Sequence, residues 1–158
     1  MEFPSRIYTD DEVGLAKALI DGGYKHRLRI VGSPSFKEKT RQAIELIKTA
    51  GDYDFLRRYI RTIREIEGLS QLREAEASLW TNAYTVSNPV SAAGFFIQKA
   101  WQMKNYIQGE EVYGHRAEKK AVDARLRFLE ALGKRTGDPK IREECLRKVK
   151  TWNETEFL

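Results

Sequence analysis

Apolar residues recur at helical spacing along most of the chain, and polar capping residues stand where these patterns begin. Thr9 and Glu12 form a capping box at the start of the first pattern, in which each side chain can bond the backbone of the other residue. Ser35 and Glu38 repeat this arrangement at the second, and Asn88, followed by proline, caps a later one. The patterns predict helices at residues 9–20, 35–50, 53–63, 89–108, 115–132 and 139–152.

Two segments alternate between polar and apolar residues, which is typical of strands. The first is His26–Val31, and the glycine and proline that follow it end the strand. The second, Ala77–Val86, is rich in strand-forming residues, and both of its faces mix polar with apolar side chains. We therefore expect this second strand at the edge of a sheet. Of the segments before it, 63–69 is expected to fray into a short strand and 70–76 to form a helical turn or a loop.

One predicted helix, residues 89–108, is apolar around almost its whole circumference, which is typical of a helix buried at the centre of a domain. Its apolar residues are Ala92, Ala93, Phe95, Phe96, Ile97, Ala100, Trp101 and Met103. The chain has 158 residues and no long linker, so we expect a single domain spanning residues 1–158. The predicted fold class is α+β, mostly helical, with a small sheet and a buried central helix.

Composition narrows the class of protein further. The chain contains no run of eighteen apolar residues, so we expect neither a membrane span nor a membrane partner. The N-terminus lacks the apolar region of a signal peptide, which favours a cytoplasmic location. The single cysteine, Cys145, stands between Ile141 and Val149 at helical spacing, and we expect it to be a packed core thiol rather than a reactive one.

The middle of the predicted central helix contains Gln98, Lys99 and Gln102, with the two glutamines one helical turn apart. Glu118 follows some sixteen residues later, in the sequence Glu-Lys-Lys-Ala that opens the next helix. This pattern resembles a zincin-like metallopeptidase of the minimal type, in which H-E-x-x-H on a central helix is followed by a glutamate ligand in E-x-x-A. The resemblance covers about residues 25–150 and implies a zincin-like fold.

In this resemblance Gln98 and Gln102 take the places of two histidine ligands, Lys99 that of the general-base glutamate, and Glu118 that of the third ligand. Glutamine binds zinc poorly, and the lysine carries a positive charge where the metal or its water would lie. We therefore expect a degenerate member with no metal, no cofactor and no peptidase activity. We also expect Gln98, Gln102 and Glu118 to hydrogen-bond one another or nearby backbone, with Lys99 paired with Glu118.

The resemblance implies a binding or scaffolding role for the former substrate cleft. The strand 78–86, with Trp80, Asn82 and Tyr84, would form one side of that cleft. An edge strand of this kind can take an extended peptide or protein by strand addition, and a second copy of the chain could bind there in the same way to form a homodimer.

Three alternatives stay open at this stage. Gln98 and Gln102 are also compatible with ordinary boundary positions of an unrelated helical domain. His115 and Glu118 lie one helical turn apart and could hold a relocated metal site. The segment 24–67 carries eleven Lys or Arg against six Asp or Glu, equal to the formal net charge of +5 for the whole chain, so a basic helical module that binds nucleic acid or another polyanion is the runner-up function. Its candidate anion-binding residues are Arg57, Arg58, Arg61 and Arg64, which otherwise form a solvated edge whose stems cover the core.

Overall fold

The computed structural model describes residues 2–156 and, of these, the side chains up to residue 154. The described chain is α+β and mostly helical, as predicted. Its helices are α1 Asp10–Asp21, α2 Pro34–Ala50, α3 Tyr53–Tyr59, the short 3-10 helix η1 Glu74–Glu76, α4 Pro89–Ile107, α5 His115–Arg135 and α6 Pro139–Glu156. Its strands are β1 Arg29–Val31, β2 Thr62–Glu65, β3 Gln71–Arg73 and β4 Ser78–Thr81.

The four strands form one mixed sheet in the order β1-β2-β4-β3. The strands β1, β2 and β4 are parallel, with Ile30 opposite Ile63 and Ile63 opposite Leu79. The strand β3 runs antiparallel to β4 and forms one edge of the sheet, while β1 forms the other. The two edges available to a partner strand are therefore β1 and β3.

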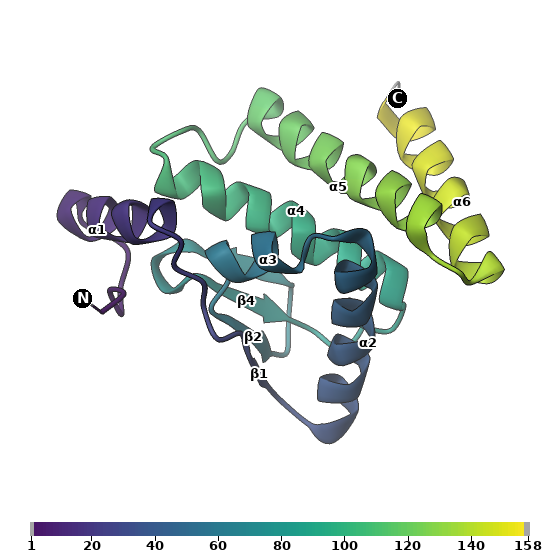
Figure 1. Cartoon of the computed structure of the whole chain (residues 1–158), viewed down its shortest axis with the longest axis horizontal. Coiled ribbons are helices and arrows are strands. Elements are labelled where there is room, and N and C mark those ends of the chain that lie inside the picture. The colour runs from purple at the N-terminus through teal and green to yellow at the C-terminus, as the bar shows by residue number, and fades with distance from the viewer. Residues whose placement is uncertain (1, 157–158) are drawn as a thin grey trace.

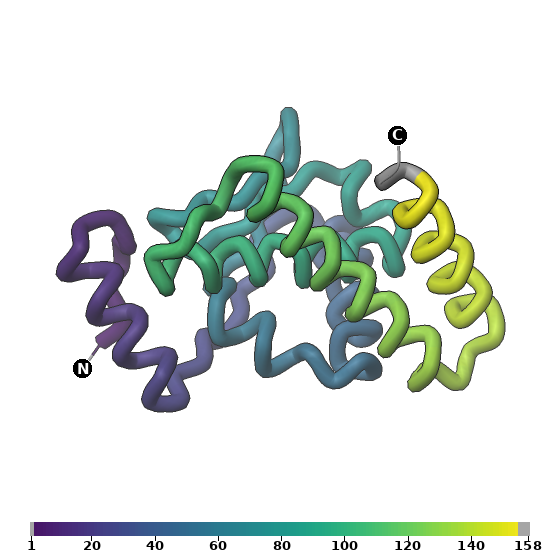
Figure 2. The backbone as a smooth tube through the Cα atoms, turned by 90° about the horizontal axis from the view of Figure 1, so that it is seen from above, coloured from purple at the N-terminus to yellow at the C-terminus, as the bar shows by residue number. Residues whose placement is uncertain are grey.

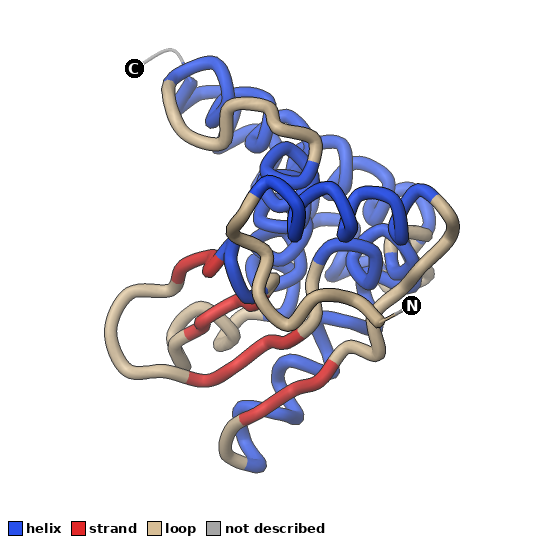
Figure 3. Tube along the Cα trace, turned by 90° about the vertical axis from the view of Figure 1, so that its left-hand side faces the viewer, coloured by secondary structure: helices blue, strands red, loops and turns tan. Residues whose placement is uncertain are grey.

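Helix α4 runs through the middle of the molecule and separates the sheet from the C-terminal helices (Figure 1). It contacts α1, α2, α3 and α5, and α6 packs mainly on α5. Figure 3 shows the strands gathered at one side, with helices covering the rest. The helices α1 and α6 lie at opposite ends of the molecule (Figure 2). Ala92, Phe96, Ala100 and Met103 of α4 are fully buried, which confirms the prediction of a buried central helix.

Two of the three predicted helix caps are confirmed. The capping box of Thr9 and Glu12 is formed at α1, and the Asn88 side chain accepts a hydrogen bond from the Ser91 backbone at α4. The prediction for α2 is wrong by two residues, because the hydroxyl of Ser33, not Ser35, accepts from the Phe36 backbone. Gly32 and Pro34 follow the end of β1 at Val31, as predicted, and at the first helical position the fixed φ of Pro34 also favours the start of α2.

The prediction of an edge strand over 78–86 is wrong. The strand β4 ends at Thr81 and lies inside the sheet between β2 and β3. Its polar residues indicated exposure, but Ser78 is buried and donates a hydrogen bond to the Thr62 carbonyl, 3.3 Å away. The chain then turns, and the Thr85 backbone donates to the Asn82 side chain. Asn82 and Tyr84 therefore follow the strand and are not part of it.

The segments on either side of β4 in the sheet also differ from prediction. The helix expected over 53–63 ends at Tyr59, and Thr62–Glu65 form β2, because Ile63 is buried between β1 and β4. Only Arg29–Val31 of the predicted strand 26–31 belongs to β1. The segment 70–76, expected as a helical turn or a loop, does contain a helical turn, η1, but the edge strand β3 precedes it and was not predicted.

Two further predictions concern single features. Cys145 is buried, and this burial raises the pKa of its thiol to about 11, so the prediction of a packed core thiol is confirmed. None of the helices in the described part of the chain is both long and apolar enough to cross a membrane.

Gly51 at the end of α2 offers a test of the α2–α3 turn. Its φ is +85°, and a Cβ there would meet the guanidinium of Arg135, which donates to the Ala50 carbonyl. We expect Gly51→Ala to lower the free energy of unfolding by about 2–3 kcal/mol, from left-handed strain and the displaced hydrogen bond. Gly23→Ala is the matched control, since its φ is +101° with no atom within 4 Å of a Cβ, and it should cost about 1–2 kcal/mol. Urea denaturation measures both, and equal losses would contradict the role of Arg135.

Candidate functional site

The helices α4 and α5 lie side by side (Figure 1), and Gln98 on α4 is next to Arg125 on α5. The Arg125 Nη1 donates a hydrogen bond to Gln98 Oε1 over 3.2 Å, and Nη2 donates to the Ser91 carbonyl over 3.3 Å. The guanidinium carbon of Arg125 also lies 4.9 Å from the centre of the Trp152 ring, which belongs to α6. Gly94 allows the Arg125 side chain to lie close to α4, because a Cβ at position 94 would be only 2.9 Å from Arg125 Nε. The arginine is thus held by one amide, one carbonyl and one aromatic ring.

Arg125 carries a largely buried positive charge without a matching negative one nearby. No carboxylate among the described side chains forms an ion pair with it, and its buried Nε has no hydrogen-bond partner there. Burial lowers the pKa of Arg125 to about 10, which leaves the guanidinium protonated at neutral pH. Buried charges in proteins are normally paired, so an unpaired one is a candidate for binding an anion.

A pocket of about 220 Å³ opens beside Arg125 at the N-terminal end of α4. It is lined by Tyr84, Thr85, Ser87, Asn88, Ser91, Phe95 and Arg125. The lining therefore contains one full charge, the guanidinium, together with several hydroxyl groups. Glu144 approaches from α6, but its carboxylate accepts a hydrogen bond from Asn88 over 2.7 Å and pairs with Lys148 over 3.7 Å. The pocket thus offers hydrogen-bond donors to a negatively charged group.

The four residues of the zinc-site pattern do not form the expected cluster. Gln98 bonds Arg125, and the described residues show no hydrogen bond that joins Gln98, Gln102 and Glu118. Gln102 is buried, and its Oε1 has no partner in that part of the chain. Glu118 is exposed in the first turn of α5 and forms no ion pair with Lys99 within the described residues. The expected amide–carboxylate network is therefore wrong, and an arginine that the pattern did not include takes its place.

Lys99 is half-buried and lies with its ammonium 5.5 Å from the centre of the Phe95 ring. Burial lowers the pKa of Lys99, and the negative charges of Glu74 and Glu118 oppose this shift. Arg125 also contributes to the lowering by like-charge repulsion. Lys99 and Arg125 therefore place two positive charges close enough to interact beside α4.

The described residues contain no group of three or more His, Cys, Asp or Glu that could hold a metal ion. His115 begins α5 and is exposed, as is Glu118 one turn later. No third ligand of these types joins the pair in the described part of the chain, so the two residues alone do not form a metal site.

The edge strand β3 is bordered by exposed large apolar side chains. Leu69 is 84% exposed and Tyr84 is 86% exposed. The two lie near one another, because the neighbouring hydroxyls of Ser70 and Thr85 are 2.7 Å apart. At the other end of β3, the exposed Tyr113 donates a hydrogen bond from its hydroxyl to Glu74. Exposed apolar side chains at both ends of an edge strand are typical of an interaction surface.

The four candidate anion-binding arginines do not share one face. Arg57 Nε donates to the His26 carbonyl over 2.9 Å, and Arg61 donates to the carbonyls of Pro4 and Ser5. Arg61 thus holds the N-terminal segment against the domain, and Arg57 holds the segment between α1 and β1. Arg58 is exposed on α3 and Arg64 is exposed on β2, so the prediction that all four arginines belong to one helix is wrong.

Comparison with known proteins adds no relative to this description. No family model, no curated protein and no solved structure matches the chain.

The sequence contains a signal for the contact of Arg125 that the zinc-site pattern does not include. Arg125 lies one turn after Ala121 and one turn before Leu129, both buried, so it interrupts the apolar face of α5. A charged residue on an apolar face requires a polar partner. Gly94, in the apolar helix α4, lacks a side chain and so leaves room for a large side chain from a neighbouring helix. The two signals together could have indicated the contact.

Proposed function

We propose that this protein is a non-catalytic, zincin-like binding module whose cleft between α4 and α5 binds an anionic group of an extended peptide. Three features support the zincin-like part of the proposal. The sheet precedes the buried helix α4, Gln98 and Gln102 lie one turn apart on it, and Glu118 stands in the first turn of α5. The edge strand in this proposal is β3, because β4 lies inside the sheet.

The chemistry of the residues argues against metal-dependent hydrolysis. Neutral amides stand at two ligand positions, and the Gln98 carbonyl already accepts from Arg125. The guanidinium and the half-buried Lys99 would both repel a divalent cation. Lysine also lacks the carboxylate that takes a proton from a metal-bound water. We infer that Arg125 supplies the positive charge that a metal supplies in an active zincin.

The observation that carries the binding function is the largely buried guanidinium of Arg125, which lines an open pocket and has no carboxylate partner among the described side chains. A carboxylate can accept two parallel hydrogen bonds from a guanidinium, and this geometry favours arginine over lysine. Leaving such a charge desolvated without a partner costs several kcal/mol, which an arriving anion would recover in part. The anionic group we propose is therefore an aspartate or glutamate side chain or a chain terminus.

The remainder of the ligand would lie along β3. An extended segment can add to a sheet edge by backbone hydrogen bonds, with alternate side chains on either face. Leu69 and Tyr84 at one end and Tyr113 at the other would contact apolar side chains of that segment. A second copy of the chain would compete for the same edge, so a dimer that dissociates when peptide is added is also compatible with this surface.

Arg125→Met tests the proposal. The probe is an acetylated pentapeptide amide with one central aspartate, compared with its asparagine counterpart by NMR titration. We expect the aspartate peptide to shift the Arg125 Nε signal and the amides of Gln71–Arg73, and to bind about tenfold more tightly than the asparagine peptide. Arg125→Met should remove this preference and leave stability equal or about 1 kcal/mol higher, because a buried charge is replaced by an apolar chain.

Two matched variants complete the experiment. Arg125→Lys keeps the charge but not the planar fork, and should retain only part of the preference. Arg58→Met removes an exposed arginine from α3 and should leave the preference unchanged. Equal binding of the two peptides by the unmodified protein, or an unchanged preference in Arg125→Met, would overturn the proposal.

A further inference from the structure

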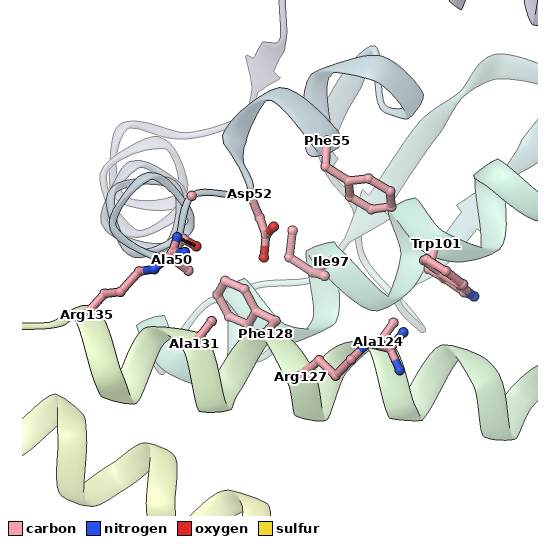
Figure 4. Close-up of a pocket in the computed structure, with 11 residues that line it drawn as sticks. Ala50, Asp52, Phe55, Ile97, Trp101, Ala124, Arg127, Phe128, Ala131 and Arg135 are labelled. Atoms are coloured by element: carbon pink, nitrogen blue, oxygen red, sulfur yellow. Dashed lines mark hydrogen bonds between the residues drawn. The ribbon is translucent and has the colours of Figure 1, made fainter. Parts of the chain in front are cut away.

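A second pocket lies on the other side of α4, lined by Ile97 and Trp101 rather than Phe95 (Figure 4). Its volume is about 330 Å³, and it opens between the α2–α3 turn, α4 and α5. It is lined by Ala50, Gly51, Asp52, Phe55, Ile97, Trp101, Ala124, Arg127, Phe128, Ala131 and Arg135. This volume is at the lower end of the range for small-molecule sites, which are mostly apolar with a few convergent polar groups.

Three aromatic side chains line this pocket. Phe55 comes from α3, Trp101 from α4 and Phe128 from α5, and all three surround the cavity in Figure 4. The rings of Phe55 and Trp101 are 6.2 Å apart between centroids with an angle of 31° between their planes. Such walls favour a flat or branched apolar group.

Asp52 is the one carboxylate among the residues that line the pocket, and its side chain points into the cavity (Figure 4). It stands at the N-cap position of α3 but makes no capping hydrogen bond. The described residues supply neither a hydrogen-bond donor nor an ion-pair partner to its side chain. Burial raises the pKa of Asp52, and the positive charge of Arg135 opposes that shift. The carboxylate is therefore half-buried and open to a donor from a ligand.

Two arginines give the pocket its positive groups. Arg135 is anchored, because it donates a hydrogen bond to the Ala50 carbonyl. Arg127 is exposed, with its guanidinium carbon 5.6 Å from the centre of the Trp101 ring, and the described residues supply it with no carboxylate partner. Of the two, Arg127 is the one free to bind an anionic group of a ligand.

We propose that this pocket binds a small zwitterion, an α-amino acid with an aromatic or branched apolar side chain. Its ammonium would donate to Asp52, its carboxylate would accept from Arg127, and its side chain would lie against Phe55, Trp101 and Phe128. A ligand that carries only a cation would be repelled by two arginines, and a ligand that carries only an anion would be repelled by Asp52. A ligand with both charges matches the lining at each end.

The experiment compares three probes by isothermal titration calorimetry: phenylalanine, phenethylamine, which lacks the carboxylate, and 3-phenylpropionate, which lacks the ammonium. We expect phenylalanine to bind at least about tenfold more tightly than either analogue. Asp52→Asn should weaken phenylalanine about tenfold and leave phenylpropionate unchanged or tighter, and Arg127→Gln should weaken phenylalanine but not phenethylamine.

Asp54→Asn is the matched control, since Asp54 lies only two residues further on, in α3, but is exposed and pairs with Lys25 over 3.5 Å, outside the pocket. It should bind phenylalanine as the unmodified protein does. Circular dichroism of each variant establishes that it is folded. Phenylalanine that binds no more tightly than its analogues, or that binds Asp52→Asn unchanged, would overturn the proposal. Arg125→Met should retain amino-acid binding, so failure of the peptide proposal and failure of this one are distinguishable.

Discussion

Replacing Phe96 with alanine is expected to lower the free energy of unfolding by about 3–5 kcal/mol. Phe96 is fully buried at the centre of α4, so the truncation removes apolar contacts and leaves a cavity. Domains of this size have total stabilities of about 5–15 kcal/mol, so the variant would be close to its unfolding threshold at room temperature. Urea denaturation followed by circular dichroism measures the loss.

Phe95→Ala is the control for this experiment, because the two phenylalanines are adjacent and differ in burial. Phe95 is half-buried, beside the ammonium of Lys99 and the pocket at Arg125. Its truncation should cost about 1–2 kcal/mol, since much of the ring already contacts solvent. Equal losses for the two variants would contradict the burial of α4 between the sheet and α5.

The second large effect is a loss of stability in mild acid that depends on His26. This side chain is 2% exposed, with its ring packed against Phe3 and Tyr24 at 4.5 and 5.1 Å between centroids. Burial, together with the positive charges of Arg61 and Arg57, lowers the pKa of His26 from 6.5 to about 4. The folded protein therefore holds this imidazole neutral.

The sign of the effect follows from proton binding. Between pH 6.5 and 4 the unfolded chain binds a proton at His26 and the folded protein does not, so stability decreases as pH decreases. The contribution is complete above pH 6.5 and is lost as pH falls to about 4, with a total of about 3 kcal/mol. His26→Phe removes the titration while keeping an aromatic ring in the cluster. The difference in unfolding free energy between the two proteins, measured from pH 7 to 4, should follow this curve, and a difference independent of pH would contradict it.

The candidate sites show which functional residues a sequence pattern can predict and which it cannot. The pattern pointed to Gln98 on α4, and in the structure Gln98 accepts a hydrogen bond from Arg125 beside the candidate pocket. The partner of Gln98 could not be predicted, because Arg125 is 27 positions away and its contact depends on the packing of α5 against α4. Gln102 and Glu118 fit the pattern equally well, but no hydrogen bond among the described residues joins either of them to Gln98, since spacing in the sequence does not fix where a side chain is directed.

The pocket around Asp52 was not predicted at all. Its residues come from four helices, α2 to α5, and the turn between α2 and α3, and each has an ordinary local explanation in the sequence. Asp52 follows Gly51 in a turn, Trp101 belongs to an apolar helix, and Arg127 is one of several charged residues on α5. Only the arrangement of these helices places one carboxylate, two guanidinium groups and three aromatic rings around one cavity (Figure 4).

The sequence by itself determined the features that depend on residues close together in the chain. The capping interactions of Thr9 and Asn88, the apolar circumference of α4 and the α+β class all follow from local hydrogen bonds and side-chain periodicity. The tertiary structure decided which strand is an edge, because pairing of β4 with both β2 and β3 joins segments that the local pattern treats separately. It also decided where charges meet, since the burial and partners of Arg125 and Asp52 are properties of packed helices and not of either helix alone.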